Sequence, residues 1–165
     1  MPIYMKTDGI TGSATGKYNG WIELDSVQLN PGRSFTSSTG RVAARDASPP
    51  SVSEIVVTKH TDVASTKLFQ ASLGGGGKKV VIHFVKEDSK GQVPYLALEL
   101  ENTLISGFSV SSHGGASTGR PMESLTLNYS KITYSATPVA ASTAPADVKD
   151  RALWNLATGG GPSGP

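Results

Sequence analysis

The strongest constraint on the fold is an alternation of apolar and polar side chains over residues 94–112. Glu99 and Glu101 lie at polar positions of this alternation, and the apolar positions have the opposite parity. They are Leu96, Leu98, Leu100, Leu104, Phe108 and Val110. A repeat of two residues is typical of a strand with one buried face. The pattern predicts one long strand with a bulge or bend near Asn102 or Gly107.

Similar alternating or β-branched segments occur along most of the chain. The expected further strands are residues 2–7, 21–29, 52–60, 78–86 and 122–136. The parity changes near Ser130 in the last of these, which predicts a second bulge. Residues 78–86 are apolar on both faces, with Val81 and Val85 on the second face. We therefore expect this strand to be central in the sheet or to be covered on its second face, by the helix or by a neighbour.

One short helix is expected among the strands. Ser65 is its predicted N-cap, and Gly74 follows its last residue. Residues 146–157 are a second helical possibility. Many strands with a single helix predict a mainly β protein, either a barrel or a sandwich with the helix plugging or flanking it.

The chain of 165 residues is long enough for one domain with a substantial core. We expect a β domain over residues 1–136. Residues 137–165 form a C-terminal arm in this interpretation, with a possible ordered patch near 148–156 and a flexible Gly/Pro tail. Residues 30–51 are predicted to be irregular, and an irregular segment of this length usually serves function or interaction.

Composition excludes several functional classes. With no cysteine, the chain has no disulfide, thiol nucleophile or cysteine-ligated metal. A net charge of +2 is too small to favour nucleic-acid binding. The N-terminus has no apolar run typical of a signal peptide, and no stretch is long enough for membrane insertion. Charged residues make up only 17% of the chain, so the surface is expected to be covered by Ser, Thr and Gly or to be partly buried against other chains.

The residues do not predict catalysis. The three histidines, His60, His83 and His113, have no metal-ligand spacing, and Glu99 with Glu101 is an ordinary polar strand face. The run of glycines before Lys78 leads from the helix into a strand, the reverse of a phosphate-binding loop. We expect no catalytic residue, no metal and no cofactor. A structural subunit of an assembly and a free-standing β-barrel that binds a small ligand are the open alternatives.

Several runs resemble the haemolysin-coregulated proteins, Hcp, of bacterial type VI secretion. Two runs near the N-terminus resemble the opening of that family's sequences: Met1-Pro2-Ile3-Tyr4-Met5 and Gly20-Trp21-Ile22-Glu23-Leu24. The other matching runs are residues 8–10, 50–55, 58–59, 62–65, 67–69, 79–84, 98–112, 121–129, 131–132 and 154–155. The match is nearly continuous over residues 1–136.

The resemblance implies a β-barrel of two antiparallel sheets flanked by one short α-helix. It implies a homohexameric ring that stacks into a hollow tube, with the type VI sheath, spike and effector proteins as partners. Such a protein is cytoplasmic in the producing cell and is then secreted without a signal peptide. The lumen can carry or chaperone effectors.

The resemblance also gives roles to particular residues of this sequence. The loop candidates for contacts between subunits or rings are Arg33, Phe35, Arg41 and Arg45. The candidates for the lumen are Ser26, Gln28 and Thr58, which are polar positions on expected strands.

Overall fold

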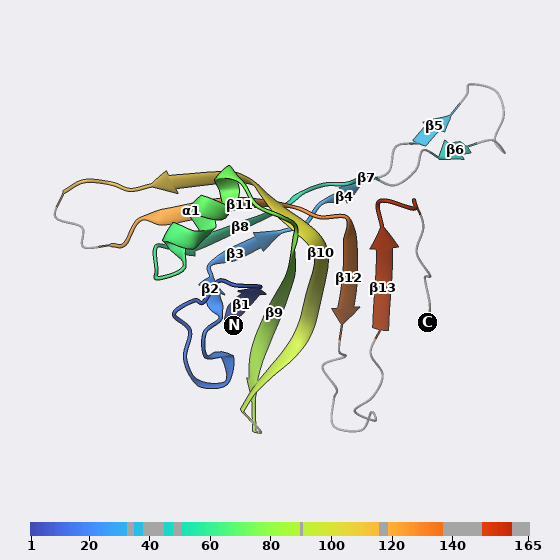
Figure 1. Cartoon of the computed structure of the whole chain (residues 1–165). Helices are drawn as coiled ribbons and strands as arrows, with labels where there is room; N and C mark the ends of the chain where they lie inside the picture. Colours follow the sequence, from blue (N-terminus) through green and yellow to red (C-terminus); the bar gives the residue numbers. More distant parts are fainter. Residues whose placement is uncertain are drawn as a thin grey trace.

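The computed structural model describes residues 1–32, 35–37, 45–47, 51–89, 91–115, 119–136 and 150–159. Its main sheet has nine strands, with the order β2-β1-β9-β10-β11-β8-β3; in addition, β12 pairs with β10, and β13 pairs with β12 (Figure 1). The strands are β1 (Ile3–Thr7), β2 (Ile22–Leu24), β3 (Ser26–Gln28), β8 (Ile55–His60), β9 (Lys78–Asp88), β10 (Gly91–Ser111), β11 (Met122–Asn128), β12 (Lys131–Ala136) and β13 (Asp150–Asn155). All pairings in this sheet are antiparallel.

Strand β10 runs through both halves of the sheet. Its first half pairs with β9 and β12, and its second half pairs with β11. Asn102 has a φ of 50°, and the register with β9 shifts there. A second shift lies between Ile105 and Gly107. The bulge or bend expected near Asn102 or Gly107 is therefore confirmed, and the strand has an irregularity at each of the two places.

The parity change near Ser130 has a larger cause than the bulge we expected. The segment is two strands, β11 and β12, which follow the same edge of β10 on either side of its bend. Ser130 lies between them, and its backbone N–H donates to the carbonyl of Glu101. The chain changes faces because it passes from one half of the sheet to the other.

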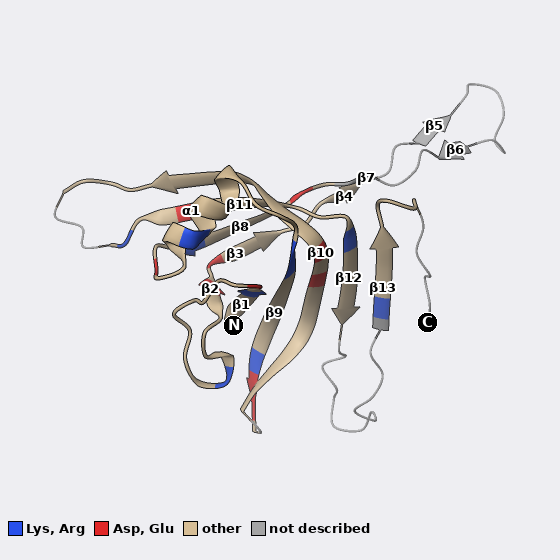
Figure 2. Ribbon diagram, viewed as in Figure 1, with Lys and Arg blue, Asp and Glu red and all other residues tan. Residues whose placement is uncertain are grey.

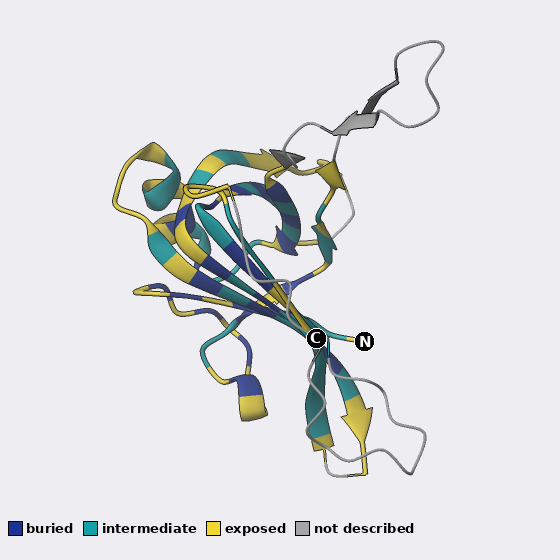
Figure 3. Cartoon of the chain, turned by 90° about the vertical axis from the view of Figure 1, so that its right-hand side faces the viewer, coloured by how far each residue is buried: buried dark blue, intermediate teal, exposed yellow. Residues whose placement is uncertain are grey.

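The core lies between the two halves of the sheet and helix α1 (Ser65–Leu73) (Figure 3). Leu68 is the buried residue of the helix. The helix ends at Leu73 as expected, but it begins one residue earlier, because Ser65 is its first residue and Ala64 is its N-cap. The Ala64 N–H donates to Asp62, and the Ser65 hydroxyl accepts from the Asp62 N–H. The all-β class with one helix is confirmed. The end strands β2 and β3 do not pair with each other among the described residues, so the barrel is open.

A second cluster covers the other face of β9. Val85 is fully buried there against Tyr4, Ala14 and Tyr18, and Trp21 packs on the same cluster. Tyr4 comes from the neighbouring strand β1, and the loop between β1 and β2, which includes the short helix η1 (Gly16–Tyr18), brings Tyr18 and Trp21 over the strand. The strand is central in the sheet, as expected. The expectation that the helix or a neighbour covers Val85 is wrong, because the chain's own N-terminal segment covers it.

The segment predicted to be irregular contains short strand pairs. β4 (Pro31–Gly32) pairs with β7 (Ser51–Val52), and β5 (Phe35–Ser37) pairs with β6 (Arg45–Ala47). Figure 1 shows β5 and β6 beyond the end of the main sheet.

The helical possibility over residues 146–157 is wrong, because residues 150–155 form strand β13 on the edge of β12. Within the described ranges, no helix is long and apolar enough to cross a membrane.

Candidate functional site

The structure brings the three lumen candidates together on one face. Ser26 pairs with Thr58 across β3 and β8, and their hydroxyl oxygens are 2.5 Å apart. Gln28 follows Ser26 on the same side of β3 and is exposed. The opposite side of these strands carries Val57, which is fully buried in the core. The candidates therefore lie on the outer face of the sheet, away from the core.

This face includes hydroxyl residues that the sequence analysis did not select. Ser124 on β11 pairs with Thr58, and Ser109 on β10 pairs with Ser124. Ser26, Thr58, Ser124 and Ser109 form one row across four strands, which we call the hydroxyl row. The alternation within residues 104–111 and 122–128 indicates that Ser109 and Ser124 lie on the polar face of their strands. Their alignment with Ser26 depends on the order of the strands, which the alternation does not give.

Among the described residues, charges lie toward the ends of this face and not at its centre. Figure 2 marks charged positions within β8 and β11, but these are Lys59 and Glu123, whose side chains are buried on the core side. At one end, Glu54 accepts hydrogen bonds from Ser106 and Asn128. At the other end, the His60 ring lies 3.7 Å from the Asp25 carboxylate. A neutral hydroxyl surface can form hydrogen bonds with many partners, but it exerts no strong electrostatic attraction.

Two strand edges flank this face. We call β10 after its bend, β11, β8 and β3 the β3 half-sheet. Within the described residues, the second half of β10 pairs only with β11, and β3 pairs only with β8. Each outer edge therefore presents backbone groups without a strand partner, and such edges readily pair with another chain.

The loop candidates cannot be assembled into a site. Arg33 and Arg41 lie outside the described residues. Phe35 begins β5 and Arg45 begins β6, and the pairing places Phe35 opposite Ala47 and Ser37 opposite Arg45. Their role in subunit contacts stays a prediction.

A buried ionic cluster fixes the start of α1 to the β3 half-sheet. Lys59 of β8 is fully buried, and its Nζ lies 2.9 Å from Glu123 Oε2 on β11 and 2.8 Å from Asp62 Oδ1. The same ammonium donates to the His60 carbonyl and to the Ser65 hydroxyl. Ser65 in turn donates to Glu123. Lys59 is surrounded by acceptors, so this Ser–Lys contact is suited to holding the helix and not to proton abstraction.

Asp62 makes stability depend on acid pH. Burial favours the neutral carboxyl, but the hydrogen bond and charge of Lys59, with the N–H of Ala64 and the hydroxyl of Ser13, lower the pKa of Asp62 overall. A folded-state pKa below the unfolded value of about 3.9 stabilises the fold above that pH. This contribution is lost as the pH falls through the folded pKa.

We therefore expect Asp62→Asn to lower the free energy of unfolding at pH 7 and to lower it less near pH 3. The wild-type carboxylate is ionised and paired at the higher pH, whereas acid removes its advantage. Urea unfolding of both proteins between pH 3 and pH 7 measures the difference. A difference that stays constant over this range would contradict the assignment.

The candidate acids and bases are occupied by structural contacts. The Nδ1 atom of His83 shares a hydrogen bond of 3.2 Å with the Tyr18 hydroxyl. The centroid of the His83 ring lies 4.9 Å from the centroid of the Trp21 ring. Burial lowers the pKa of His83 despite the opposing charge of Glu99. His113 is exposed in the loop after β10.

The two glutamates of β10 pair with lysines. Glu99 lies 3.3 Å from Lys79, and Glu101 lies 3.3 Å from Lys131. Each carboxylate therefore belongs to an exposed ion pair on the sheet surface. Within the part of the chain that the structure describes, no group of three metal-ligating side chains occurs.

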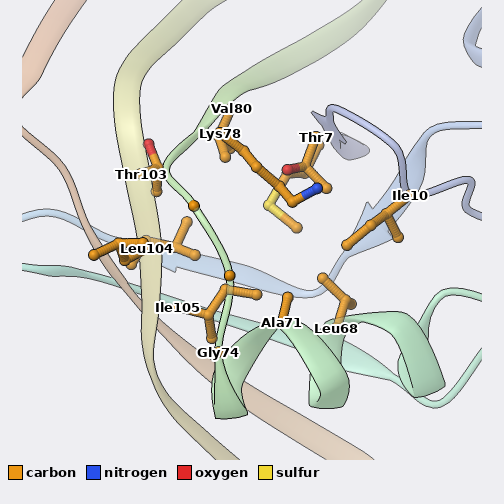
Figure 4. A pocket seen from close by; sticks show the side chains of 14 residues that line it. Thr7, Ile10, Leu68, Ala71, Gly74, Lys78, Val80, Thr103, Leu104 and Ile105 are labelled. Carbon is orange, nitrogen blue, oxygen red and sulfur yellow. The ribbon is translucent and has the colours of Figure 1, made fainter.

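A small pocket lies between α1 and the sheet, next to the glycine run (Figure 4). Its interior of about 30 Å³ holds about one water molecule. Thr103 contributes a buried hydroxyl that has no hydrogen-bond partner among the residues that the structure describes, and Lys78 at the rim donates to the Asp8 carbonyl. Ligand sites are normally about ten times larger. The glycine run here connects a helix to a strand, as the sequence predicts.

Comparison with known proteins gives the class of this fold. A structure titled as a type six secretion system protein has a TM-score of 0.86 and 23% identity, and the match covers 96% of this chain and 98% of that one. Hcp1 from Salmonella typhimurium has a TM-score of 0.73 and 18% identity, with 95% of each chain covered. A type VI secretion system effector from Yersinia pestis has a TM-score of 0.71 and 19% identity, with 93% and 98% covered. The bent sheet with one helix is therefore the fold of these secretion proteins.

The sequence itself identifies the family. The family model described as type VI secretion system effector, Hcp, matches residues 4–135. No curated protein sequence matches the chain. The chain belongs to the Hcp family, and its role is that of a tube subunit of the type VI secretion system.

Proposed function

We propose that copies of this chain join into homohexameric rings that stack into a hollow tube, which a contracting sheath expels from the producing cell. Such a subunit is cytoplasmic before secretion and acts with the sheath, spike and effector proteins. The role is structural and requires no catalysis. Membership of the Hcp family supports the proposal, and one structural observation carries it.

That observation is the pair of open edges on the β3 half-sheet. The edge of β10 and the edge of β3 are different surfaces on opposite sides of the same set of strands. A contact that joins one surface to a different surface is heterologous, and it closes into a ring when the rotation between copies allows. Each copy then uses both edges.

We further propose that the outer face of the β3 half-sheet lines the lumen. Ser26, Gln28 and Thr58 lie on this face together with the rest of the hydroxyl row. Its neutral side chains would contact an effector through weak, replaceable hydrogen bonds. A lumen of this kind suits cargo that must be released again.

The loop residues Arg33, Phe35, Arg41 and Arg45 are proposed to contact a neighbouring subunit or ring. The position of β5 and β6 beyond the main sheet supports this proposal, because they can reach past the body of their own subunit (Figure 1). The arginines would meet an acidic surface.

The purified full-length chain should form rings with a central hole in negative-stain images, and light scattering should give the mass of a hexamer. Deletion of residues 33–45 should leave the β domain folded, as circular dichroism reports, but should abolish the rings or their stacking. Compact monomers of the full-length chain at all concentrations would contradict the tube function. Normal tubes from the deletion variant would contradict only the loop assignment.

A further inference from the structure

We propose that residues 11–21, between β1 and β2, form a cover over the second face of β9 that acid releases. Protonation of His83 undoes the contacts that fasten this segment, and its opening exposes Val85. We call residues 11–21 the cover loop. The ring cluster consists of Tyr4, Tyr18, Trp21 and His83. The inference goes beyond the tube function and does not depend on it.

The ring cluster joins the cover loop to the sheet through close aromatic contacts. The Tyr18 ring stacks on Tyr4 of β1, with 4.4 Å between the centroids and 10° between the planes. The Trp21 ring meets Tyr18 edge to face at 5.0 Å, and its centroid lies 4.9 Å from that of His83. Val85 belongs to the same cluster and is fully buried. Rings at these distances hold the loop by more than the apolar area that they bury.

The cover loop can open while the rest of the fold stays closed. Its two ends are fixed, because Ile10 and Ile22 both belong to the main core. Its two sides are bound to each other, since the Gly12 N–H donates to the Gly20 carbonyl. Outside the ring cluster, the loop is attached through two exposed hydrogen bonds from its side chains, one to a carboxylate before α1 and one to a carbonyl of β10. The ring cluster is therefore its main attachment.

His83 is the titratable group within this attachment. Its Nδ1 shares a hydrogen bond with the Tyr18 hydroxyl. Tyr18 is only 4% exposed, and among the described residues its hydroxyl has no other hydrogen-bond partner. Nδ1 of a neutral imidazole can accept the hydroxyl proton, whereas the charged ring has only donors. Protonation of His83 therefore leaves the buried Tyr18 O–H without an acceptor, which destabilises the closed loop.

The charged groups around His83 do not compensate for this loss. Glu99 of β10 favours the charged imidazole, but its carboxylate lies 3.3 Å from the Lys79 ammonium. The Lys6 ammonium lies 5.9 Å from the centroid of Trp21, so this ring already faces one cation. Burial outweighs the charge of Glu99 and lowers the pKa of His83. The other titratable groups on the strands and loop around His83 are Tyr4, Lys17, Tyr18, Glu23 and Glu87.

Acid should therefore favour the open loop. A histidine whose pKa is lower in the closed form than in the open form stabilises the closed form while the ring is neutral. As the pH falls through about 6.5, the usual pKa of histidine, the open form binds the proton first. The closed form loses population until the pH has passed the lower pKa of the closed form. Such an opening is local, because the main core does not contain His83.

Thiol labelling measures the opening, because the chain has no native cysteine. Val85→Cys buries a thiol against the ring cluster, and Val63→Cys places one at a site that is 72% exposed. Dithiodipyridine, which reacts with thiols even in mild acid, labels both full-length variants at pH 7.5 and at pH 5.0. The labelling rate of Val85→Cys divided by that of Val63→Cys should rise about threefold or more on acidification. Asp62 stays ionised over this range, because its pKa is lowered.

Substitutions at the ring cluster assign the rise to His83. His83→Gln in the Val85→Cys background should abolish it, because glutamine is neutral at both pH values. His113→Gln is the matched control, since His113 is exposed in the loop after β10 and the rise should remain. Tyr18→Phe keeps the ring but removes the hydroxyl that loses its acceptor, so it should reduce the rise. This variant decides the question if His83→Gln does not fold.

Val57→Cys reports the main core, because Val57 is fully buried there. Its labelling ratio should stay flat between the two pH values. An equal rise at Val57 and Val85 would reveal a general loosening and would overturn the proposal. A flat ratio at Val85 would overturn it as well, and so would a rise that persists in His83→Gln. None of these results bears on the tube function, which the images of rings test separately.

Discussion

Lys59→Met is expected to lower the free energy of unfolding by about 3–5 kcal/mol, because it leaves buried carboxylates without their cation. Glu123 and Asp62 both contact the Lys59 ammonium, and the lysine side chain is fully buried. The start of α1 should lose its attachment first, since Ser65 belongs to the same cluster. Urea unfolding followed by circular dichroism at pH 7 measures the change.

Two further variants separate burial from charge. Lys79→Met removes an exposed ion pair with Glu99 and should cost at most about 1 kcal/mol. Lys59→Met/Glu123→Met replaces the buried pair with apolar groups and should recover part of the loss, because one uncompensated carboxylate is removed. If Lys59→Met cost no more than Lys79→Met, the cluster would not contribute as described.

Gly12→Ala is expected to destabilise the fold by about 2–3 kcal/mol, through overlap that the loop cannot easily relieve. A Cβ at this position would overlap the Trp21 carbonyl and the Ile22 backbone. The Gly12 N–H also donates to the Gly20 carbonyl at 2.8 Å, so the two sides of the loop are held close together at this point. The loss should include the packing of Trp21, which thermal unfolding and near-ultraviolet circular dichroism together detect.

Gly76→Ala is the matched control for this substitution. A Cβ there would have no atom within 4 Å. Its φ lies outside the left-handed region, so alanine should leave stability unchanged or raise it by about 0.4–1 kcal/mol. Equal losses for the two alanine variants would show that the close approach at Gly12 is not the cause.

Local patterns in the sequence predict the elements that depend on them. The alternation in residues 94–112 predicts the long strand β10, and its irregularities locate the bend at Asn102 and the shift before Gly107. The end of α1 at Leu73 agrees with the expected helix for the same reason, and its start differs by one residue. Hydrophobic period and end signals are properties of a short segment, so the sequence alone carries them.

Features that depend on distant partners were missed. Residues 150–155 have no strong period, and they form a strand because β12 offers an edge to pair with. Val85 is covered by rings from a loop whose path depends on the close approach at Gly12. Tertiary contacts decide the structure of such segments more than local propensity does.

The candidate site shows the same division. Lys59 shares the core-facing parity of Val57, and Glu123 shares that of Leu125. Considered alone, each is a charged side chain at a position that should be apolar. The register places Lys59 opposite Glu123, which explains both. The alignment of Ser26 with Thr58 likewise appears only with the strand order. The position of these side chains in a lumen stays a prediction.

The course of β10 has a mechanical consequence. Because one continuous strand belongs to both halves of the sheet, a pulling force on either half is transmitted to the other through the covalent backbone. The halves cannot separate unless ladders with β9, β11 or β12 are sheared. The domain should therefore bear load as one unit, without a weak joint at which partial rupture could begin.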